Sequence, residues 1–188
     1  MRLILVAAPG AGKSQQSKMI VSEFGLTYFS SGMFFRDYFG RENIFQGYKK
    51  EDFDRGILCS DDIVNSMVKI SLPFDNYLLD GYPRTLPQVE FLDEDICKNG
   101  IDYRVIHLDV PLEVCRERLV RRGSLEARSD DQERVIIDRL NIYERLTGLV
   151  VEHYRARGLL IETSGLGSIE DVSSRLREKI KTYKDGHL

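Results

Sequence analysis

The sequence has few cysteines and no long apolar run. Its three cysteines, Cys59, Cys97 and Cys115, are widely scattered and form no CxxC pair, so we expect neither a disulfide framework nor a structural zinc site. No apolar stretch approaches the length that spans a membrane. The run LILVAA at 3–8 is too short for a signal peptide. We therefore expect a protein of a reducing, cytoplasmic compartment with no membrane partner.

The charge balance is also unremarkable, at a net charge of -3 over 188 residues. It provides no global basic field, so no nucleic-acid partner is expected. The length suits one compact α/β domain spanning 1–188, and the chain contains no internal repeat, low-complexity segment or long linker.

Short apolar runs, rich in residues that favour strands, recur along the chain with helix-length segments between them. This order predicts a parallel, doubly wound sheet, and in such a sheet ligands bind beyond the carboxyl ends of the strands. The runs are 3–7, 26–29, 77–79, 103–108 and 159–161.

A glycine-rich turn, AAPGAGKS at 7–14, joins the first run to a segment at 13–24 that favours a helix. Gly10 and Gly12 permit backbone dihedrals that turn successive N–H groups toward an anion. The helix N-terminus and Lys13 add positive charge, and Ser14 offers a hydroxyl to a metal ion. This matches the P-loop pattern GxxxxGK(S/T), except that its first glycine is Ala7. The alternative is an ordinary strand-to-helix connection.

Polar residues follow the second and third runs. After the second run, Ser30 or Ser31 can cap a helix, and Arg36 lies about one turn along it, so that both can face one cleft. The alternative is a capped helix with a surface arginine. After the third run, Asp80 is placed to order water around a magnesium ion, and Arg84 presents a fork of donors that matches phosphate. Gln88 is placed to read the edge of a base. The alternative for this stretch is a turn with a salt-bridged arginine.

An arginine-rich region follows the fourth run. We expect one helix to end at Gly123 and the next to begin at Ser129 or Asp130, with Arg128 in the short loop between them.

The side chains of these two helices follow a helical period. Arg118 and Arg122 share a face of the first helix. On the second helix Arg139 lies beside the inward stripe, so it requires a partner. The stripe consists of Ile136, Leu140, Tyr143, Leu146 and Val150.

His107 lies within the fourth run, isolated in the sequence from any serine, cysteine or metal-ligand partner. We interpret it as a structural residue, because phosphoryl transfer does not require a histidine.

The motifs APGAGKS, SSGxxxR, GILCSD, DGYPRTxxQ, RLVRRG and RSDDQE occur in an order and at a spacing that resemble the nucleoside monophosphate kinases, and most closely the adenylate kinases of the short-lid type. The resemblance covers nearly the whole chain. It implies a P-loop NTPase-like fold, with a five-stranded parallel sheet flanked by helices. It also implies a monophosphate-binding segment at about 31–60 and a lid at about 122–132, which lacks the cysteines of the zinc-bearing lid.

The activity that the resemblance implies is reversible transfer of the terminal phosphoryl group from Mg-ATP to AMP, giving two ADP, by an enzyme that we expect to be a monomer. The implied catalytic residues are Lys13, Arg84, Arg118, Arg122, Arg128 and Arg139. ATP is expected at Gly10, Ala11, Gly12, Lys13, Ser14, Gln15, Arg118, Arg122 and Gly167, with Mg²⁺ at Ser14 and, through water, at Asp80. AMP is expected at Ser31, Arg36, Ile57, Leu58, Cys59, Gly81, Tyr82, Pro83, Arg84, Gln88, Arg128 and Arg139.

Four positions vary from the family pattern. Ser31 stands where adenylate kinases usually have threonine and pyrimidine-specific relatives tend to have alanine, which favours adenine. Ala7 replaces a glycine, Gln15 replaces a threonine, and Met33 replaces an aspartate that helps to hold the water shell of magnesium. The alternatives to an ATP:AMP phosphotransferase are a UMP/CMP-type kinase and a catalytically weakened nucleotide-binding or sensing module.

Overall fold

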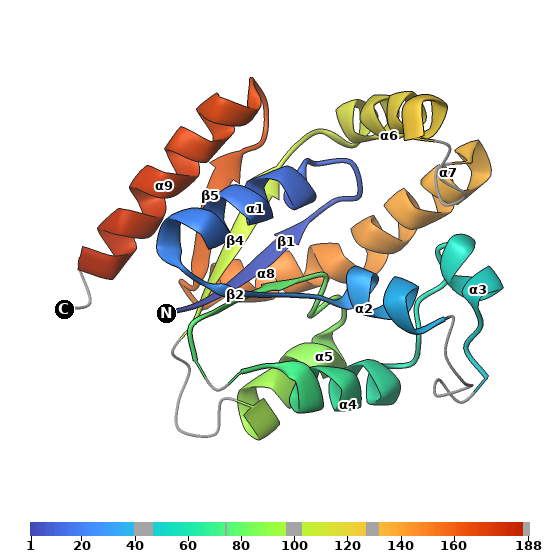
Figure 1. Cartoon of the computed structure of the whole chain (residues 1–188), viewed down its shortest axis with the longest axis horizontal. Coiled ribbons are helices and arrows are strands. Elements are labelled where there is room, and N and C mark those ends of the chain that lie inside the picture. The colour runs from blue at the N-terminus through green and yellow to red at the C-terminus, as the bar shows by residue number, and fades with distance from the viewer. Residues whose placement is uncertain (40–46, 74, 97–102, 127–131, 186–188) are drawn as a thin grey trace.

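The computed structural model describes residues 1–39, 47–73, 75–96, 103–126 and 132–185 (Figure 1). Its centre is a five-stranded sheet in which every pairing is parallel, in the order β2-β3-β1-β4-β5. The strands are β1 Arg2–Ala7, β2 Thr27–Ser30, β3 Tyr77–Asp80, β4 Arg104–Asp109 and β5 Leu160–Ser164. The parallel sheet predicted from the sequence is confirmed.

The strand order sets where a ligand binds. After β1 the chain moves toward the edge of the sheet formed by β2. After β3 it moves in the opposite direction, to β4. Connections that leave in opposite directions open a crevice beyond the carboxyl ends of the two strands. Here those ends are Ala7 on β1 and Asp80 on β3, the two places where the sequence shows its phosphate-binding motifs.

Helices cover both faces of the sheet (Figure 1). One face is covered by α1 Lys13–Phe24, α6 Leu112–Glu126 and α9 Ile169–Asp185, and the other by α4 Asp61–Ser71, α5 Leu86–Phe91 and α8 Gly148–Ala156. The remaining helical segments are α2 Ser31–Tyr38, α3 Lys50–Asp54, α7 Glu133–Ile142, and the π-helical turns η1 Leu92–Ile96 and η3 Tyr143–Thr147.

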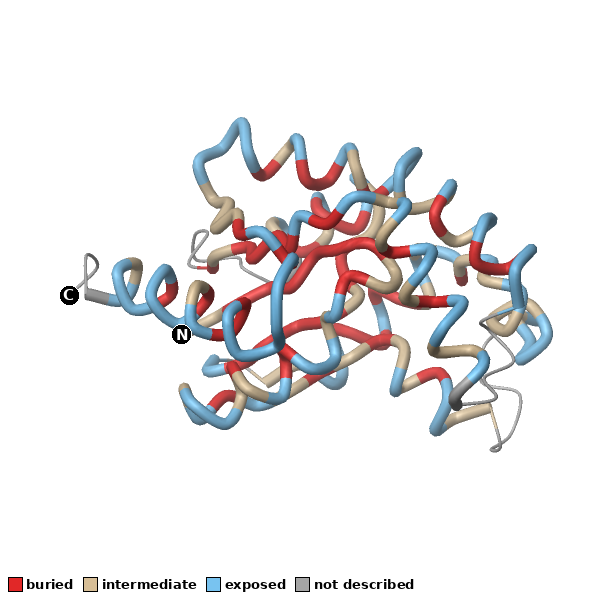
Figure 2. Tube along the Cα trace, turned by 90° about the horizontal axis from the view of Figure 1, so that it is seen from above, coloured by how far each residue is buried: buried red, intermediate tan, exposed pale blue. Residues whose placement is uncertain are grey.

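Alternate residues of each strand supply two separate apolar cores, because successive side chains of a strand point to opposite faces. On β1, Leu3 and Leu5 pack toward α1, α6 and α9, whereas Ile4 and Val6 pack toward α4, α5 and α8. Figure 2 shows the result, with buried strands at the centre and helices that bury only their inner stripes. This rigid, double-sided sheet fixes the strand ends that carry the site.

Two boundaries expected for the arginine-rich region are wrong. The helix α6 continues through Gly123 to Glu126, because the backbone at Gly123 stays helical and a glycine permits a left-handed cap without requiring one. The next helix, α7, begins at Glu133 rather than at Ser129 or Asp130. Ser129, Asp130 and Arg128 lie outside the described residues, as does the whole of 127–131 within the predicted lid.

The inward stripe of the next helical stretch is also different from the prediction at one position. Leu146 is 37% exposed, and Thr147 is buried in its place. The cause is the π-helical turn η3, in which the Gly148 N–H donates to the carbonyl of Tyr143, five residues earlier. A π turn holds one more residue than an α turn, so the inward face shifts by one position.

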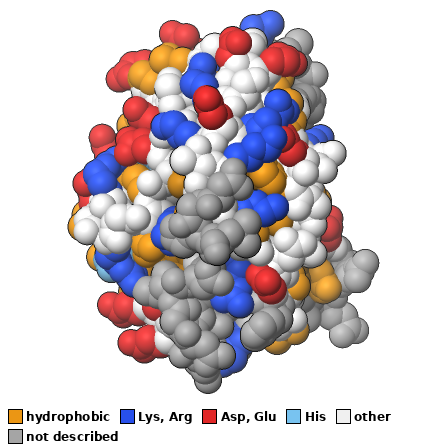
Figure 3. Space-filling view, turned by 90° about the vertical axis from the view of Figure 1, so that its left-hand side faces the viewer, with side chains coloured by type: hydrophobic (Ala, Val, Ile, Leu, Met, Phe, Trp, Pro, Cys, Tyr) orange, Lys and Arg blue, Asp and Glu red, His pale blue; other side chains and the backbone are white. Residues whose placement is uncertain are grey.

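The surface carries mixed charge. On the face drawn in Figure 3, basic and acidic side chains are interspersed, so the side chains visible there form no large field of one sign. Within the part of the chain that is described, no helix is both long and apolar enough to cross a bilayer.

Candidate functional site

The turn after β1 has the backbone of a phosphate-binding loop. Gly10 and Gly12 adopt φ values of 84° and 99°, which L side chains rarely adopt. A Cβ added at Gly10 would also lie 2.4 Å from the carbonyl oxygen of Cys115. Gly12 directly precedes α1, so the first turn of that helix, which includes the exposed Ser14, opens onto the loop. An anion placed there meets unsatisfied N–H groups and the positive end of the helix dipole.

Lys13 folds back over this loop. Its Nζ donates to the carbonyls of Ala7 at 2.7 Å and Ala8 at 2.9 Å. The pKa of Lys13 is lowered to about 8, mainly by burial, while the carboxylate of Asp80 opposes the shift and the nearby Arg84 and Arg139 contribute to it. The ammonium is therefore held at the loop with its charge only partly compensated, a state that favours a phosphate ligand.

One cleft collects most of the residues that the sequence predicts for a monophosphate. Lys13 lies at its P-loop end, and the cleft continues between α2, the segment around α3, and the turn after β3. Its lining includes Ser31, Arg36, Ile57, Leu58, Cys59, Gly81, Pro83, Arg84, Gln88 and Arg139. Side chains far apart in the sequence thus share one pocket.

Arg84 is held in the cleft by its backbone and its side chain. Its N–H donates to Gln88 Oε1 at 2.7 Å, and its Nε donates to the carbonyl of Gly81 at 2.9 Å. From the other side of the cleft, the Thr147 hydroxyl donates to the Arg84 carbonyl at 3.2 Å. Burial lowers the pKa of Arg84, and Asp80 opposes that effect. Because these contacts fix the residue, its guanidinium is positioned before any ligand binds.

Asp80 is buried at the end of β3, and Tyr28 on β2 donates a hydrogen bond to its Oδ2 at 2.7 Å. The Tyr28 side chain was not predicted from the sequence, because the contact joins residues 52 positions apart. Ser31, also buried, donates to the Gly81 carbonyl at 2.8 Å. Met33, by contrast, is an exposed residue of α2. A carboxylate at the strand end is thus fixed by a neighbouring hydroxyl.

Aromatic rings line the acceptor side of the cleft. Phe35 of α2 packs against Tyr48 and Phe53, with ring centroids 5.4 Å and 6.0 Å away. The Tyr48 hydroxyl donates to the carbonyl of Ile57 at 2.6 Å, and the Arg36 guanidinium lies 5.8 Å from the centre of the Phe53 ring. These rings give the predicted monophosphate segment a packed wall that is able to stack against a base.

Arg118 connects the P-loop to the segment after β5. Its guanidinium donates to the carbonyls of Ala11 at 3.4 Å and Gly165 at 3.2 Å. Gly167, two residues further on, adopts a φ of 104°. Arg122 lies one turn beyond Arg118 on α6 and is half-buried. The structure therefore brings Arg118 of α6, and with it the backbone at Gly165, to the loop.

Two predicted AMP contacts have partners within the protein. The Tyr82 side chain is fully buried, and its hydroxyl has two acceptors for its one proton, Asn65 Oδ1 at 2.8 Å and the Gln88 carbonyl at 3.0 Å, so it is not available to a nucleotide. The Gln88 amide nitrogen donates to Asp61 Oδ1 at 2.6 Å. An amide nitrogen has two N–H groups, so Gln88 keeps one for a base.

Two oxygen donors for a metal ion lie at the loop and at the end of β3. Among the described residues, no group of three or more His, Cys, Asp and Glu side chains is arranged to hold a metal ion. The Ser14 hydroxyl and the Asp80 carboxylate are hard oxygen donors, which suit Mg²⁺. Magnesium in phosphoryl-transfer sites is held mainly by substrate phosphates and water, so a protein cage is not needed.

The parallel sheet, the glycine-rich loop and the basic cleft define an α/β protein of the P-loop type. Residues 5–159 match the family model for adenylate kinase. Curated adenylate kinases are similar over almost the whole chain. The one from Thermobifida fusca is 38% identical, covering 97% of this chain and 99% of that protein. The one from Carboxydothermus hydrogenoformans is 35% identical, covering 96% and 100%. The chain belongs to the adenylate kinase family.

Both of these relatives are named adenylate kinase, and nothing in the comparisons favours a UMP/CMP-type kinase or a non-catalytic nucleotide-binding module. The chain is accordingly a nucleotide-binding transferase with an ATP site.

The low pKa of Lys13 predicts a pH dependence of ATP binding. In the empty loop the ammonium loses its proton as the pH rises through about 8. Bound phosphates raise its pKa again, so binding takes up a proton above that pH and ATP affinity falls, by up to about tenfold per pH unit. Calorimetric titrations with ATP between about pH 7 and pH 9.5 measure this effect.

The matched control is Lys13→Arg, because a guanidinium keeps its charge over this range. Its affinity for ATP is expected to show no step near pH 8. If the wild-type protein and Lys13→Arg give the same pH profile, the titrating group is not Lys13.

Proposed function

We propose that the cleft described above is where this member of the adenylate kinase family transfers the terminal phosphoryl group of ATP to AMP, giving two ADP. The observation that carries the proposal is the placement of Lys13, Arg36, Arg84 and Arg139 around one pocket next to the P-loop. A P-loop alone binds phosphate in many kinds of protein. A second set of cations beside it gives the acceptor phosphate a place in line with the donor.

The roles within the cleft follow from charge. The loop at 10–15 cradles the ATP phosphates, and Lys13 exchanges its bonds with its own loop carbonyls for bonds to phosphate. Arg36 and Arg84 hold the AMP phosphate, and Arg139 approaches from α7. The transition state spreads negative charge over the equatorial oxygens of the transferred group, so fixed cations stabilise it more than the ground state.

The further roles rest on the family resemblance and on position. Arg118 and Arg122 close over the ATP phosphates together with Arg128, which lies outside the described residues, and Gly167 lies beside the ATP base. The segments at about 31–60 and 122–132 act as the monophosphate-binding segment and the lid of one kinase domain. Lid closure excludes water, which limits hydrolysis of ATP.

Magnesium is proposed to enter with ATP, held by its phosphates, with the Ser14 hydroxyl and, through water, Asp80 as protein partners. When bound, it neutralises phosphate charge. Tyr28 fixes one oxygen of Asp80, which keeps the carboxylate in place although the usual second aspartate is Met33. The chain is further proposed to work as a monomer in the cytoplasm, with no nucleic-acid or membrane partner and no structural zinc.

The acceptor is proposed to be AMP because Ser31, a hydroxyl residue, lies in the cleft wall beside Gln88. A coupled assay with Mg-ATP and each of the nucleoside monophosphates tests this. We expect the highest kcat/KM with AMP. A preference for CMP or UMP would contradict the acceptor assignment, and no transfer to any monophosphate would contradict the enzymatic function.

Arg84→Ala is expected to lower kcat/KM for AMP by about a hundredfold or more, because an arginine that meets the transferred charge contributes strongly to phosphoryl transfer. Folding is expected to remain close to that of the wild type, since burial already disfavours this guanidinium. Steady-state kinetics and urea unfolding measure the two effects.

The control for Arg84→Ala is Arg177→Ala. Arg177 forms an exposed ion pair with Glu23, away from the cleft, and exposed pairs contribute little. We expect its kinetics to match the wild type. A large loss of stability in Arg84→Ala with unchanged kinetics would mean that Arg84 is a structural residue.

Met33→Asp is expected to lower the magnesium concentration that gives half-maximal rate, by about two- to fivefold, because a second carboxylate beside Asp80 strengthens the attraction for the hydrated ion. Met33 is exposed, so the substitution is tolerated by the fold. Met33→Asn, which has the same shape without the charge, is the control. Equal magnesium requirements for the two variants would contradict the placement of Met33 near the ion.

A further inference from the structure

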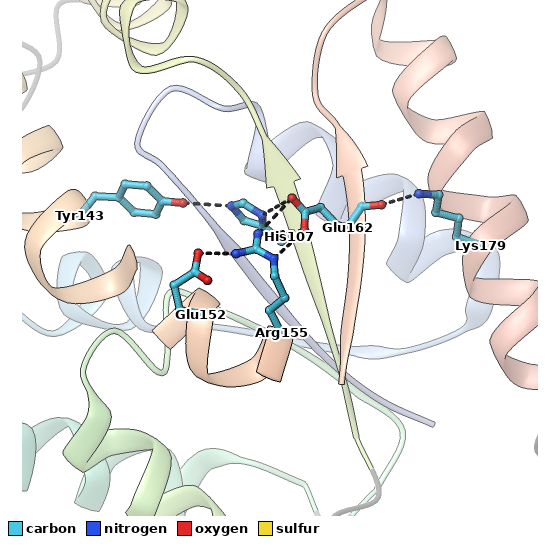
Figure 4. Close-up of polar contacts among 6 residues, drawn as sticks. All are labelled: His107, Tyr143, Glu152, Arg155, Glu162 and Lys179. Carbon is cyan, nitrogen blue, oxygen red and sulfur yellow. Dashed lines mark hydrogen bonds and ion pairs between the residues drawn. The ribbon is translucent and has the colours of Figure 1, made fainter. Parts of the chain in front are cut away.

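His107 is buried on β4 and has two polar neighbours, one on each side of its ring (Figure 4). Its Nε2 lies 3.1 Å from the hydroxyl oxygen of Tyr143, and its Nδ1 lies 3.8 Å from Glu162 Oε1 on β5. The first distance is a hydrogen bond and the second is too long for one. The ring is therefore tied mainly to Tyr143.

The outer side of this group is an ion-pair network. Arg155 of α8 donates to Glu162 Oε2 at 2.9 Å and also pairs with Glu152, and Lys179 of α9 donates to the Glu162 carbonyl. Figure 4 shows Glu162 and Lys179 on the side of the His107 ring opposite Tyr143, with Arg155 below the ring between Glu162 and Glu152. This network fixes β5 and α8 relative to each other and encloses the histidine from the solvent side.

The inner side of the group reaches the cleft. Tyr143 begins the π turn η3 and lines the cleft, as does Thr147 at the end of the same turn. Thr147 donates to the carbonyl of Arg84, and Arg139 lies one turn before Tyr143 on α7. The π turn in contact with His107 is thus connected to both arginines, because it directly follows the helix that carries Arg139 and its Thr147 contacts Arg84 across the cleft.

We propose that His107 is a positioning residue for phosphoryl transfer. By its hydrogen bond to Tyr143 it anchors the π turn to the sheet and so sets the places of Arg84 and Arg139. A π turn is less favourable than a continuous α-helix and persists where its surroundings hold it. Here the bond from β4 is that support. The inference rests on the proposed function, and it replaces the interpretation of His107 as a residue without a role in the reaction.

The chemistry of the ring suits this role. Burial lowers the pKa of His107, although Glu162 and Asp109 oppose that effect and Arg155 adds to it. The neutral ring has one acceptor nitrogen, so Nε2 accepts the Tyr143 proton while Nδ1–H faces Glu162. Burial also raises the pKa of Tyr143 to about 12, so the phenol stays protonated and able to donate.

The test compares variants that keep or lose the bond at Nε2. His107→Gln places an amide atom near the position of Nε2 and is expected to keep most of the wild-type kcat, whereas His107→Leu and Tyr143→Phe each lower kcat about tenfold, the size of one hydrogen bond. The double variant is expected to be no slower than either single variant, because both remove the same contact. KM for ATP is expected to change less than kcat, since the ATP loop does not depend on this turn.

Arg155→Ala is the control, because it removes the outer ion pairs with Glu152 and Glu162 and leaves the bond between His107 and Tyr143. Its kcat is expected to equal that of the wild type, and urea unfolding of all variants separates loss of fold from loss of rate. Wild-type kcat in His107→Leu, an equal loss in His107→Gln, or additive losses in the double variant would each overturn the proposal. If His107→Leu does not fold, Tyr143→Phe against His107→Gln makes the same comparison.

Failure of this inference is distinct from failure of the proposed function. If the wild-type protein transfers phosphate to AMP and His107→Leu has the same kcat, only the positioning role of His107 is contradicted. If the wild-type protein transfers phosphate to no monophosphate, the proposed function itself is contradicted.

Discussion

The carboxylate of Asp80 is the charge on which the cleft depends. It is buried at the end of β3, and its field opposes the burial that lowers the pKa values of both Lys13 and Arg84. Without Asp80, the cations of Lys13, Arg84 and Arg139 would repel one another with no nearby anion, which would raise the free energy of the folded protein. Tyr28 holds Asp80 in place. A polyphosphate that enters the cleft supplies the anionic charge that one carboxylate provides only in part, so binding energy is available to orient the reacting groups.

The supports of the cleft come from elements that are distant in the sequence. Gln88 and Thr147 form hydrogen bonds with the backbone N–H and carbonyl of Arg84. The Tyr48 hydroxyl donates to the Ile57 carbonyl, and His107 on β4 forms a hydrogen bond with Tyr143 of the π turn. The contacts of Gln88, Thr147 and His107 satisfy polar groups that are partly buried. The same contacts therefore stabilise the fold and fix the cations, which is the condition for electrostatic catalysis by a preorganised site.

The sequence predicted the parts that depend on local pattern. Apolar runs and glycine spacing predicted the parallel sheet, and the segment 13–24 coincides with α1. The apolar pattern did not predict the π turn, because the residues of a π turn do not differ in type from those of an α-helix. The prediction that Leu146 faces inward was therefore wrong. The partners of His107 and Asp80 were also missed, since Tyr143 and Tyr28 meet them only through the sheet topology. Nothing in a single sequence marks such pairs.

We propose that ATP at the P-loop and AMP in the adjoining cleft bind at the same time, with their phosphates in line. The most direct measurement is a calorimetric titration with a dinucleotide in which five phosphates join two adenosines, since it fills both positions at once. The account predicts one molecule bound per chain, about a hundredfold or more tighter than ATP or AMP alone. Binding of two molecules per chain, or an affinity no better than that of ATP, would contradict it.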